Sequence, residues 1–420
     1  MKILNSQLGL IENKCYVILK KFLAIVLVLL ICALAMPPAV VNADDKEEDE
    51  EVTVTFSDKY IETAGKPVVD AAAVVVMEAG SGRVLFSKNP TVKRSIASTT
   101  KIMTAIIALE NAGLDDKVEI SRRAASVYGS TIGLKAGDTY TLEDLMYGML
   151  LNSGNDCAIA VAEYIGGTVE NFANMMNSKA KEIGASGTVY VTPHGLDADG
   201  QYSTAYDLAI ITRYAFKNED FCKIVSTKSR QIQGHSLYNT NELLDIYPGA
   251  DGVKTGYTGK AGRCLVASAT KDGMRLISVV LGCVSRNKRA ESSRNALEYG
   301  FKNYKLYTLV EEGKEFGTIP VIKGKKGAVM VKAAETVTMP LTEDEYESLE
   351  KRISLPDKFA APIYAGMDVG AVQFLTDGTE LACIPLKTWS NVDKKNYLDY
   401  LAEVIASWAK MMREGIFYSL

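Results

Sequence analysis

Two β-hairpin patterns that lie far apart in the chain place the strongest constraint on its fold. Residues 72–77 and 83–87 are apolar runs separated by EAGSG, and residues 264–270 and 275–282 are joined by KDG, so each pair predicts an antiparallel hairpin. Apolar residues recur with helical spacing between the hairpins, in residues 98–112, 142–151, 156–166, 169–183 and 204–216. A sheet built from both ends of a domain around a helical insert is an α+β arrangement.

The sequence pattern changes after the second hairpin. A helical pattern near residues 287–302 closes the first domain, whereas past Tyr307 the chain alternates in short runs such as GAVMVKAAETVTMP and AVQFLTDGTELACIPL, with Asp377-Gly378 as a turn. These runs predict a smaller, mostly β domain. It contains no cluster of histidine, cysteine or paired carboxylates that would indicate chemistry, which favours a supporting role.

The N-terminus is typical of an export signal. Two lysines precede an uncharged run of 14 residues, FLAIVLVLLICALA, which is shorter than the ~20 apolar residues that a membrane-spanning helix needs. Val41 and Ala43 suit the two specificity positions of a cleavage site, and an uncleaved membrane anchor is the alternative. We therefore predict a signal peptide over residues 1–43, followed by an acidic segment over residues 44–68.

The composition argues against several other kinds of function. The net charge is -4, and no long cluster of lysine and arginine appears in the body of the chain, so nothing indicates a nucleic-acid partner. The cysteines beyond the signal peptide form no Cys-x-x-Cys pair and are Cys157, Cys222, Cys264, Cys283 and Cys383. With only two histidines in the chain, we expect mostly buried thiols, with no disulfide framework, no metal site and no cofactor.

The C-terminus has an amphipathic pattern between Lys394 and Glu414, in which charged residues interrupt any membrane-spanning run. The apolar residues recur with helical spacing at Leu398, Leu401, Ile405, Trp408 and Met412. Such a helix can lie in a membrane interface with its tryptophan at the level of the lipid headgroups. A terminal helix that docks on the protein itself is an equally good interpretation of this segment.

Ser98 opens a strongly apolar helical pattern and stands three residues before Lys101. The spacing alone is weak evidence, because five other serines also have a lysine three residues later. On a helix, however, residues i and i+3 share a face, so the Lys101 amine can reach the Ser98 hydroxyl. Apolar surroundings favour the neutral amine, which can then serve as a base. A helix-capping serine followed by an ordinary lysine is the alternative.

Two further motifs could complete a catalytic cleft. Ser153 and Asn155 stand in LLNSGNDCAIA, where a tight turn can aim a hydroxyl and an amide at one cleft, although Ser-Gly-Asn-Asp is also ordinary helix-capping chemistry. The chain's only Lys-Thr-Gly, residues 254–256, supplies a charge, a hydroxyl and a glycine that another backbone can approach closely. A phosphate-binding loop ending at Lys260 is excluded. Lys254 stands where that motif needs its first glycine, and Ala261 stands where it needs a serine or threonine.

These motifs occur in the order that is found in the active-site serine penicillin-recognising enzymes. The sequence closely resembles the D-alanyl-D-alanine carboxypeptidases, which are the low-molecular-mass penicillin-binding proteins. The matching stretches are SGRVLFSKNPTVKRSIASTTKIMTA, GDTYTLEDLMYGMLLNSGNDCAIAVAE, PHGLDADGQYSTAYDLA and YPGADGVKTGYT, all between about Ala72 and Tyr304. The resemblance continues more loosely through the β domain and the terminal helix, both of which that family has.

The resemblance implies a three-part architecture for the chain. A β-lactamase/transpeptidase-like domain, with an antiparallel sheet and a helical cluster, would occupy residues 69–304. A β-rich domain over residues 305–391 and an amphipathic membrane-anchoring helix over residues 392–420 would follow. The protein would then be exported and held at the outer face of the bacterial cytoplasmic membrane.

The resemblance also implies the catalytic roles. Ser98 would attack the carbonyl of the penultimate D-alanine of a peptidoglycan stem peptide, and Lys101 would take its proton. Ser153 would pass a proton to the departing D-alanine, with Asn155 holding the substrate amide. Backbone N–H groups of Ser98 and Tyr257 would bind the oxyanion.

The remaining implied roles concern the free terminal carboxylate of the substrate. Lys254, Thr255 and Arg289 would face it, beside Gly256, and the planar arginine fork suits a carboxylate. Arg289 lies in SRNKRAESSR, where a solvated charge cluster is the alternative. His194 could suggest a triad base, but no Ser-His-Asp order supports that role, and we expect it to be structural and near the cleft.

The implied function is therefore a serine-type D-Ala-D-Ala carboxypeptidase that β-lactam antibiotics acylate. A DD-endopeptidase acting on cross-links is the nearest alternative. A class A β-lactamase is less consistent with the sequence, because no Glu-x-x-Leu-Asn stretch lies between the second and third motifs. A non-catalytic wall-binding scaffold would have no physical reason to keep a lysine in apolar surroundings beside a serine.

Overall fold

A five-stranded antiparallel sheet forms the centre of the first domain in the computed structural model, which describes residues 65–413. The predicted signal peptide and most of the acidic segment lie outside the described residues. The strand order is β2-β1-β9-β8-β7. The strands are β1 (Ala73–Glu78), β2 (Val84–Lys88), β7 (Ala250–Thr258), β8 (Gly262–Lys271) and β9 (Met274–Cys283). Both predicted hairpins are thus confirmed, and they pair through β1 and β9 as the α+β interpretation requires.

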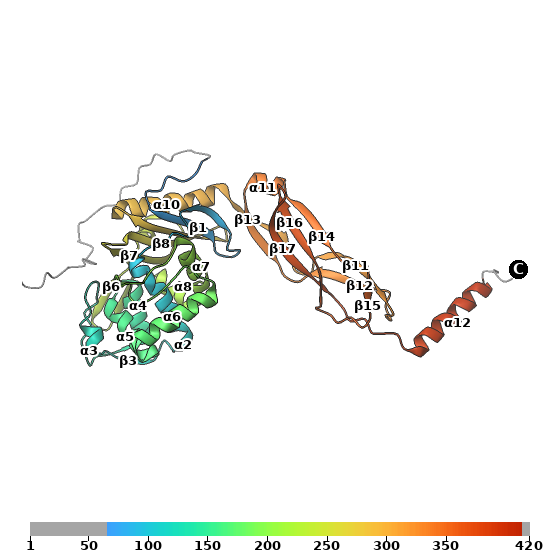
Figure 1. The fold of residues 1–420 in the computed structure, drawn as a ribbon, viewed down its shortest axis with the longest axis horizontal. Helices are drawn as coiled ribbons and strands as arrows, with labels where there is room; N and C mark the ends of the chain where they lie inside the picture. The colour runs from blue at the N-terminus through green and yellow to red at the C-terminus, as the bar shows by residue number, and fades with distance from the viewer. Residues whose placement is uncertain (1–64, 414–420) are drawn as a thin grey trace, which may run out of the picture. The chain divides into compact units, whose positions relative to one another are not determined.

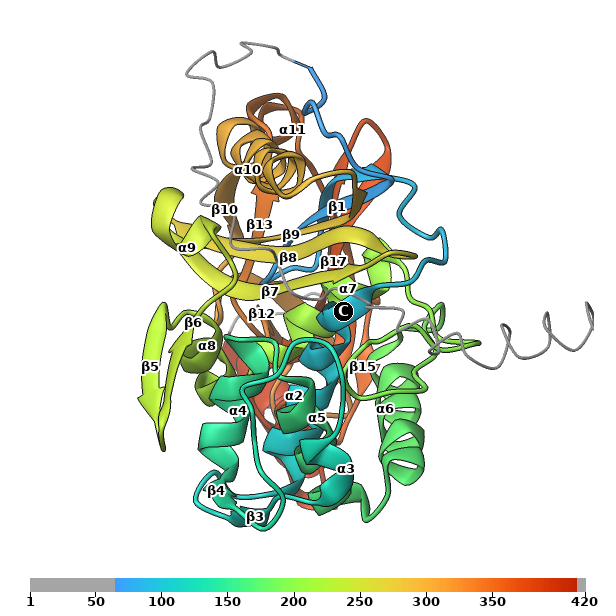
Figure 2. The same ribbon diagram turned by 90° about the vertical axis from the view of Figure 1, so that its left-hand side faces the viewer.

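Both faces of this sheet are buried, because successive side chains of a strand point to opposite sides. Val75 of β1 packs into the core that the helical insert provides, whereas its neighbour Val74 packs beneath helix α10 (Arg286–Asn303). Figure 2 shows α10 along one face of the sheet and the helical cluster along the other. The two edge strands of this sheet, β2 and β7, each pair with a single neighbouring strand within residues 65–413.

The insert between the hairpins is helical, and its predicted helices agree with the structure to within about two residues, apart from the first one. Its helices are α2 (Lys101–Asn111), α3 (Arg122–Ala125), α4 (Leu142–Leu150), α5 (Asn155–Gly166), α6 (Val169–Ile183), α7 (Ala205–Ala215), α8 (Glu219–Val225) and α9 (Leu243–Ile246). Two small hairpins complete it, made of β3 (Lys117–Glu119) with β4 (Thr139–Thr141) and β5 (Ser229–Ile232) with β6 (His235–Tyr238).

Helix α2 begins later than the periodicity suggests. Residues Ala97–Thr100 form a 3₁₀ turn, η1, and the α-helix starts at Lys101 with Thr100 as a cap that makes no side-chain hydrogen bond. The interpretation of Ser98 as a helix cap is therefore wrong, because Ser98 lies within the 3₁₀ turn. Every residue from Lys101 to Ala108 is buried.

The second domain is mostly β, and Asp377-Gly378 forms the predicted turn between its last two strands. Its elements are β10 (Lys305–Val310), β11 (Glu315–Ile322), β12 (Ala328–Ala333), β13 (Val337–Leu341), α11 (Glu343–Glu347), β14 (Glu350–Ser354), β15 (Phe359–Ala360), β16 (Asp368–Thr376) and β17 (Thr379–Thr388). They enclose an apolar core of their own, which includes Val331, Val372 and Leu386.

The amphipathic C-terminal pattern forms helix α12 (Tyr397–Arg413), drawn in red in Figure 1. Within residues 65–413, no helix is both long enough and apolar enough to cross a membrane. The five cysteines named above are free thiols, of which Cys157, Cys264 and Cys283 are buried.

Candidate active site

Ser98 lies in a turn that two glycines allow to pack tightly. Ala97, just before it, has a positive φ of 47°, a conformation that costs a residue with a side chain roughly 1 kcal/mol or more. A Cβ on Gly195 would stand 2.0 Å from the Ala97 carbonyl oxygen, and a Cβ on Gly256 would stand 2.9 Å from the Ser98 nitrogen. The close backbone approach predicted for Gly256 therefore exists, and the backbone that approaches is that of Ser98 itself.

Lys101 connects the first motif to the second. Its side chain is fully buried, and its Nζ donates to the Ser98 Oγ at 2.8 Å and to the Asn155 Oδ1 at 2.7 Å. The Ser153 Oγ lies 3.4 Å from the same nitrogen. A nucleophile candidate, an amine and a second hydroxyl therefore share one buried cluster, which is the geometry that nucleophilic catalysis requires.

His194 contributes to this cluster through its backbone. Its carbonyl oxygen accepts a hydrogen bond from the Lys101 Nζ at 2.9 Å, and Thr104 fixes the same turn by donating to the Pro193 carbonyl at 2.6 Å. Burial, reinforced by the charges of Lys101 and Arg123, lowers the pKa of the imidazole to about 3. The ring nitrogen Nδ1 accepts from the Leu196 N–H, so the neutral ring carries its proton on Nε2.

Ser153 and Asn155 occupy the turn between α4 and α5. Ser153 has a φ of 62°, the second strained non-glycine residue in the cluster. The Asn155 side chain accepts from Lys101 and donates to the Tyr128 carbonyl at 2.9 Å. Both ends of this amide thus have protein partners, so Asn155 positions the lysine; its predicted contact with a substrate amide stays a prediction.

Asp156 anchors the loop that lies beside this turn. Its buried carboxylate accepts backbone N–H hydrogen bonds from Ile132 at 3.0 Å, Gly133 at 2.9 Å and Leu134 at 3.2 Å. The Asn155 backbone donates to the Ser130 carbonyl at 2.7 Å. This role of Asp156 was not predicted from the sequence, although an acidic residue directly after the second motif was a usable signal.

The third motif lies on the edge strand β7. Lys254 and Thr255 are buried, and the Lys254 Nζ donates to the Thr255 carbonyl at 3.1 Å. The Thr255 hydroxyl shares a 2.6 Å hydrogen bond with the hydroxyl of Thr240, a residue that sequence reasoning did not single out. Tyr257 is half-buried, with the guanidinium of Arg263 stacked 4.0 Å from its ring centroid.

Arg289 lies in the first turn of α10, and its side chain is wholly buried. The interpretation as a solvated charge is therefore wrong. One guanidinium nitrogen, Nη2, donates to both carboxylate oxygens of Glu242, at 2.9 and 2.7 Å. Glu242 stands two residues after Thr240, so a single short segment contacts both Thr255 and Arg289.

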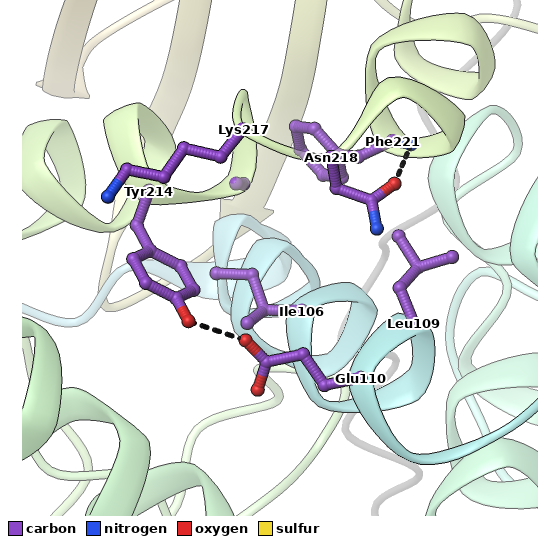
Figure 3. A pocket seen from close by; sticks show the side chains of 8 residues that line it. Ile106, Leu109, Glu110, Tyr214, Lys217, Asn218 and Phe221 are labelled. Carbon is purple, nitrogen blue, oxygen red and sulfur yellow. Dashed lines mark hydrogen bonds between the residues drawn. The ribbon is translucent and has the colours of Figure 1, made fainter.

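A surface pocket in the first domain lies elsewhere and is lined by Ile106, Leu109, Glu110, Tyr214, Ala215, Lys217, Asn218 and Phe221. Figure 3 shows the Tyr214 hydroxyl pointing at Glu110, to which it donates at 2.6 Å. Glu110 also pairs with Lys179. None of the motif residues lines this pocket, and its polar groups are engaged in packing the helices.

Comparison with known proteins identifies the protein family of the chain that carries this cluster. Residues 61–285 match the family model for D-alanyl-D-alanine carboxypeptidase. The chain belongs to the D-alanyl-D-alanine carboxypeptidase family. Residues 304–394 of this family member also match the model for the C-terminal domain of penicillin-binding protein 5.

The relatives of this carboxypeptidase-family chain match about four fifths of it. D-alanyl-D-alanine carboxypeptidase DacF of Bacillus subtilis is 35% identical over 353 residues, which is 81% of this chain and 90% of the relative. D-alanyl-D-alanine carboxypeptidase DacC of Escherichia coli is 34% identical, over 80% of this chain and 88% of the relative. Penicillin binding protein 5 of Haemophilus influenzae superimposes with a TM-score of 0.73 at 32% identity, over 79% of this chain and all of that structure.

Proposed function

We propose that the protein is a serine-type D-Ala-D-Ala carboxypeptidase that removes the terminal D-alanine from peptidoglycan stem pentapeptides. One observation carries the proposal. The buried Lys101 amine lies within hydrogen-bond distance of Ser98 and contacts the second motif through Asn155. A pre-assembled serine and amine of this kind, in a family of D-alanyl-D-alanine carboxypeptidases, is suited to acyl transfer.

In the acylation step, the Ser98 Oγ attacks the carbonyl carbon of the penultimate D-alanine while Lys101 accepts the hydroxyl proton. The oxyanion is bound by the backbone N–H groups of Ser98 and Tyr257, and each such donor typically lowers the barrier by about 3 kcal/mol. The peptide C–N bond then breaks. Ser153, 3.4 Å from the lysine amine, relays the proton to the leaving nitrogen, so that D-alanine departs as the free amino acid.

In the deacylation step, water attacks the acyl carbonyl carbon and Lys101 accepts a proton from it. The ester C–O bond then breaks, the Ser98 Oγ takes this proton back from Lys101, and the shortened peptide is released. Lys254, Thr255 and Arg289 recognise the terminal carboxylate of the substrate. Glu242 offsets the charge of the buried Arg289 while no substrate is present. β-Lactams, which carry a carboxylate and a reactive amide, acylate the same serine.

We also propose that the protein is exported and is held at the outer face of the cytoplasmic membrane by α12. The exposed large apolar residues of this helix include Leu398, Leu401, Val404, Ile405 and Trp408. They remain exposed in the structure, which favours a membrane interface over docking on the protein. Substituting Leu398, Leu401 and Ile405 together by serine tests this anchor, because the variant protein should leave the membrane fraction of cells.

Labelling with a fluorescent penicillin tests the nucleophile. Ser98→Ala should abolish the covalent adduct, whereas Ser268→Ala, which alters a buried serine that also precedes a lysine by three residues, should leave labelling intact. A labelled Ser98→Ala protein would refute the assignment. Incubation with a stem pentapeptide should release free D-alanine, and a parallel incubation with cross-linked dimers separates this activity from that of an endopeptidase.

A further inference from the structure

Three segments of the β domain meet at one end of its sheet, where they form what we call the basal surface. They are residues 322–328, from the end of β11 to the start of β12, residues 361–367 before β16, and residues 388–396, which lead from the end of β17 to α12. The third segment binds both others. Ile363 and Val392 exchange backbone hydrogen bonds of 3.0 and 2.9 Å, and the Lys325 N–H donates to the Asp393 carbonyl at 2.8 Å.

The basal surface is strongly basic. Its lysines are Lys323, Lys325, Lys326, Lys394 and Lys395, against a single acidic residue, Asp393. All of these lysines are exposed except Lys395, which is half-buried. Two of them form ion pairs with the start of α12, namely Lys325 with Asp399 at 3.9 Å and Lys395 with Glu403. This charge contrasts with the net charge of -4 of the whole chain.

Large apolar side chains stand among these lysines. Tyr364 is 63% exposed and Trp389 is 57% exposed, and Ile322 and Met367 are also exposed. The Lys332 ammonium lies 4.4 Å from the Trp389 ring centroid and covers part of the indole. The residues that carry these side chains are held in place, because Thr388 donates to the Tyr364 carbonyl at 2.6 Å and the Trp389 N–H donates to the Met330 carbonyl at 2.9 Å.

We propose that the basal surface is a second membrane contact, which binds anionic phospholipid beside the α12 anchor. This proposal rests on the membrane location proposed above. Lysines attract the negative headgroups, while tyrosine and tryptophan suit the boundary between headgroups and acyl chains. The basal surface runs directly into α12, which begins at Tyr397. An anionic wall polymer would match the lysines but would offer no apolar layer for Tyr364 and Trp389.

Vesicle binding of the whole chain tests the charge component. The variant K323Q/K325Q/K326Q should bind vesicles with about one third phosphatidylglycerol roughly a hundredfold more weakly than the unaltered protein. Binding to vesicles of phosphatidylcholine alone should not change, and high salt should remove the difference. The matched control K302Q/K305Q/K314Q removes three exposed lysines outside the basal surface and should bind like the unaltered protein.

The two tryptophans of the chain, Trp389 and Trp408, report on the two contacts separately. In W408F the emission of Trp389 should shift to the blue on anionic vesicles and be quenched by brominated lipid. In W389F the emission of the remaining tryptophan, Trp408, reports in the same way on contact between α12 and the membrane. Penicillin labelling at an unchanged rate verifies that the first domain of each variant is folded, and an unchanged circular dichroism spectrum verifies the same for the β domain.

The outcomes separate the two membrane proposals. An unshifted Trp389 together with undiminished vesicle binding of K323Q/K325Q/K326Q would overturn the second contact, even if Trp408 responds. A responding Trp389 with an unshifted Trp408 would support the basal surface and overturn the α12 anchor. If the lysine variant loses affinity for purified cell wall but not for vesicles, the partner is the wall polymer and the membrane proposal fails.

Discussion

Glu242 places both of its carboxylate oxygens on one guanidinium nitrogen of Arg289, at 2.9 and 2.7 Å, and the arginine is completely buried. Two elements that are distant in sequence, the segment before β7 and the first turn of α10, are joined by this pair. Removing one member of a buried ion pair is costly, because the charge that stays behind remains desolvated and loses that compensation.

Glu242→Ala should therefore lower the free energy of unfolding by about 3 kcal/mol. Urea denaturation measures the change. Glu170→Ala is the matched control, because the ion pair of Glu170 with Arg123 is exposed on both sides and should contribute less than about 1 kcal/mol. Equal effects of the two substitutions would show that burial does not set the strength of the Arg289 pair.

Gly195→Ala should abolish acylation by penicillin. A Cβ at this position would stand 2.0 Å from the Ala97 carbonyl oxygen, so the turn that carries Ser98 would have to move. Gly200 has a similar φ, 83° against 91°, but no atom within 4 Å of its Cβ position. Gly200→Ala should cost only about 1 kcal/mol of stability and should still be acylated. Normal acylation of Gly195→Ala would contradict the role of this close contact.

Asn155→Ala should slow penicillin acylation by about a hundredfold, since misplaced catalytic groups commonly cost that much. The substitution removes the Lys101 acceptor at 2.7 Å and the donor to Tyr128. Asn177→Ala serves as the control, because Asn177 makes a comparable pair of hydrogen bonds to the backbone of Tyr190. That control should lose stability but keep its acylation rate, as stopped-flow fluorescence can measure.

The buried His194 should make the protein sensitive to acid. Its pKa is about 3 in the folded chain against an ordinary value of 6.5, so between these values the unfolded state binds more protons. The stabilising contribution is complete above pH 6.5 and falls by up to about 1.4 kcal/mol per pH unit as the pH drops towards 3. His194→Gln should flatten this part of the stability profile, as urea titrations at several pH values would detect.

The same variant separates a structural histidine from a catalytic one. His194 holds Lys101 through its backbone carbonyl, which a substitution of the side chain preserves. The pH profile of pentapeptide hydrolysis should therefore keep its shape in His194→Gln. Loss of one limb of that profile would instead assign the imidazole a role in proton transfer.

The sequence alone determined the elements and the motifs of this protein. The hairpin of β8 and β9 and the helices α4 to α7 follow from apolar periodicity and turn residues, which are local properties of the chain. The order of Ser98, Ser153-x-Asn155 and Lys254-Thr255-Gly256 indicated the family, and the comparisons confirmed it. Spacing alone could not distinguish Ser98 from the other serines that precede a lysine.

The tertiary structure decided which groups meet. The carbonyl of His194 on Lys101, the Thr240 hydroxyl on Thr255 and Glu242 on Arg289 each join residues that are separate in sequence. A backbone carbonyl has no sequence signature, and a buried ion pair depends on how distant elements pack against each other. Periodicity therefore located the helix behind Ser98, whereas only packing could define the 3₁₀ turn, the strained Ala97 and the buried amine that together make up the candidate site.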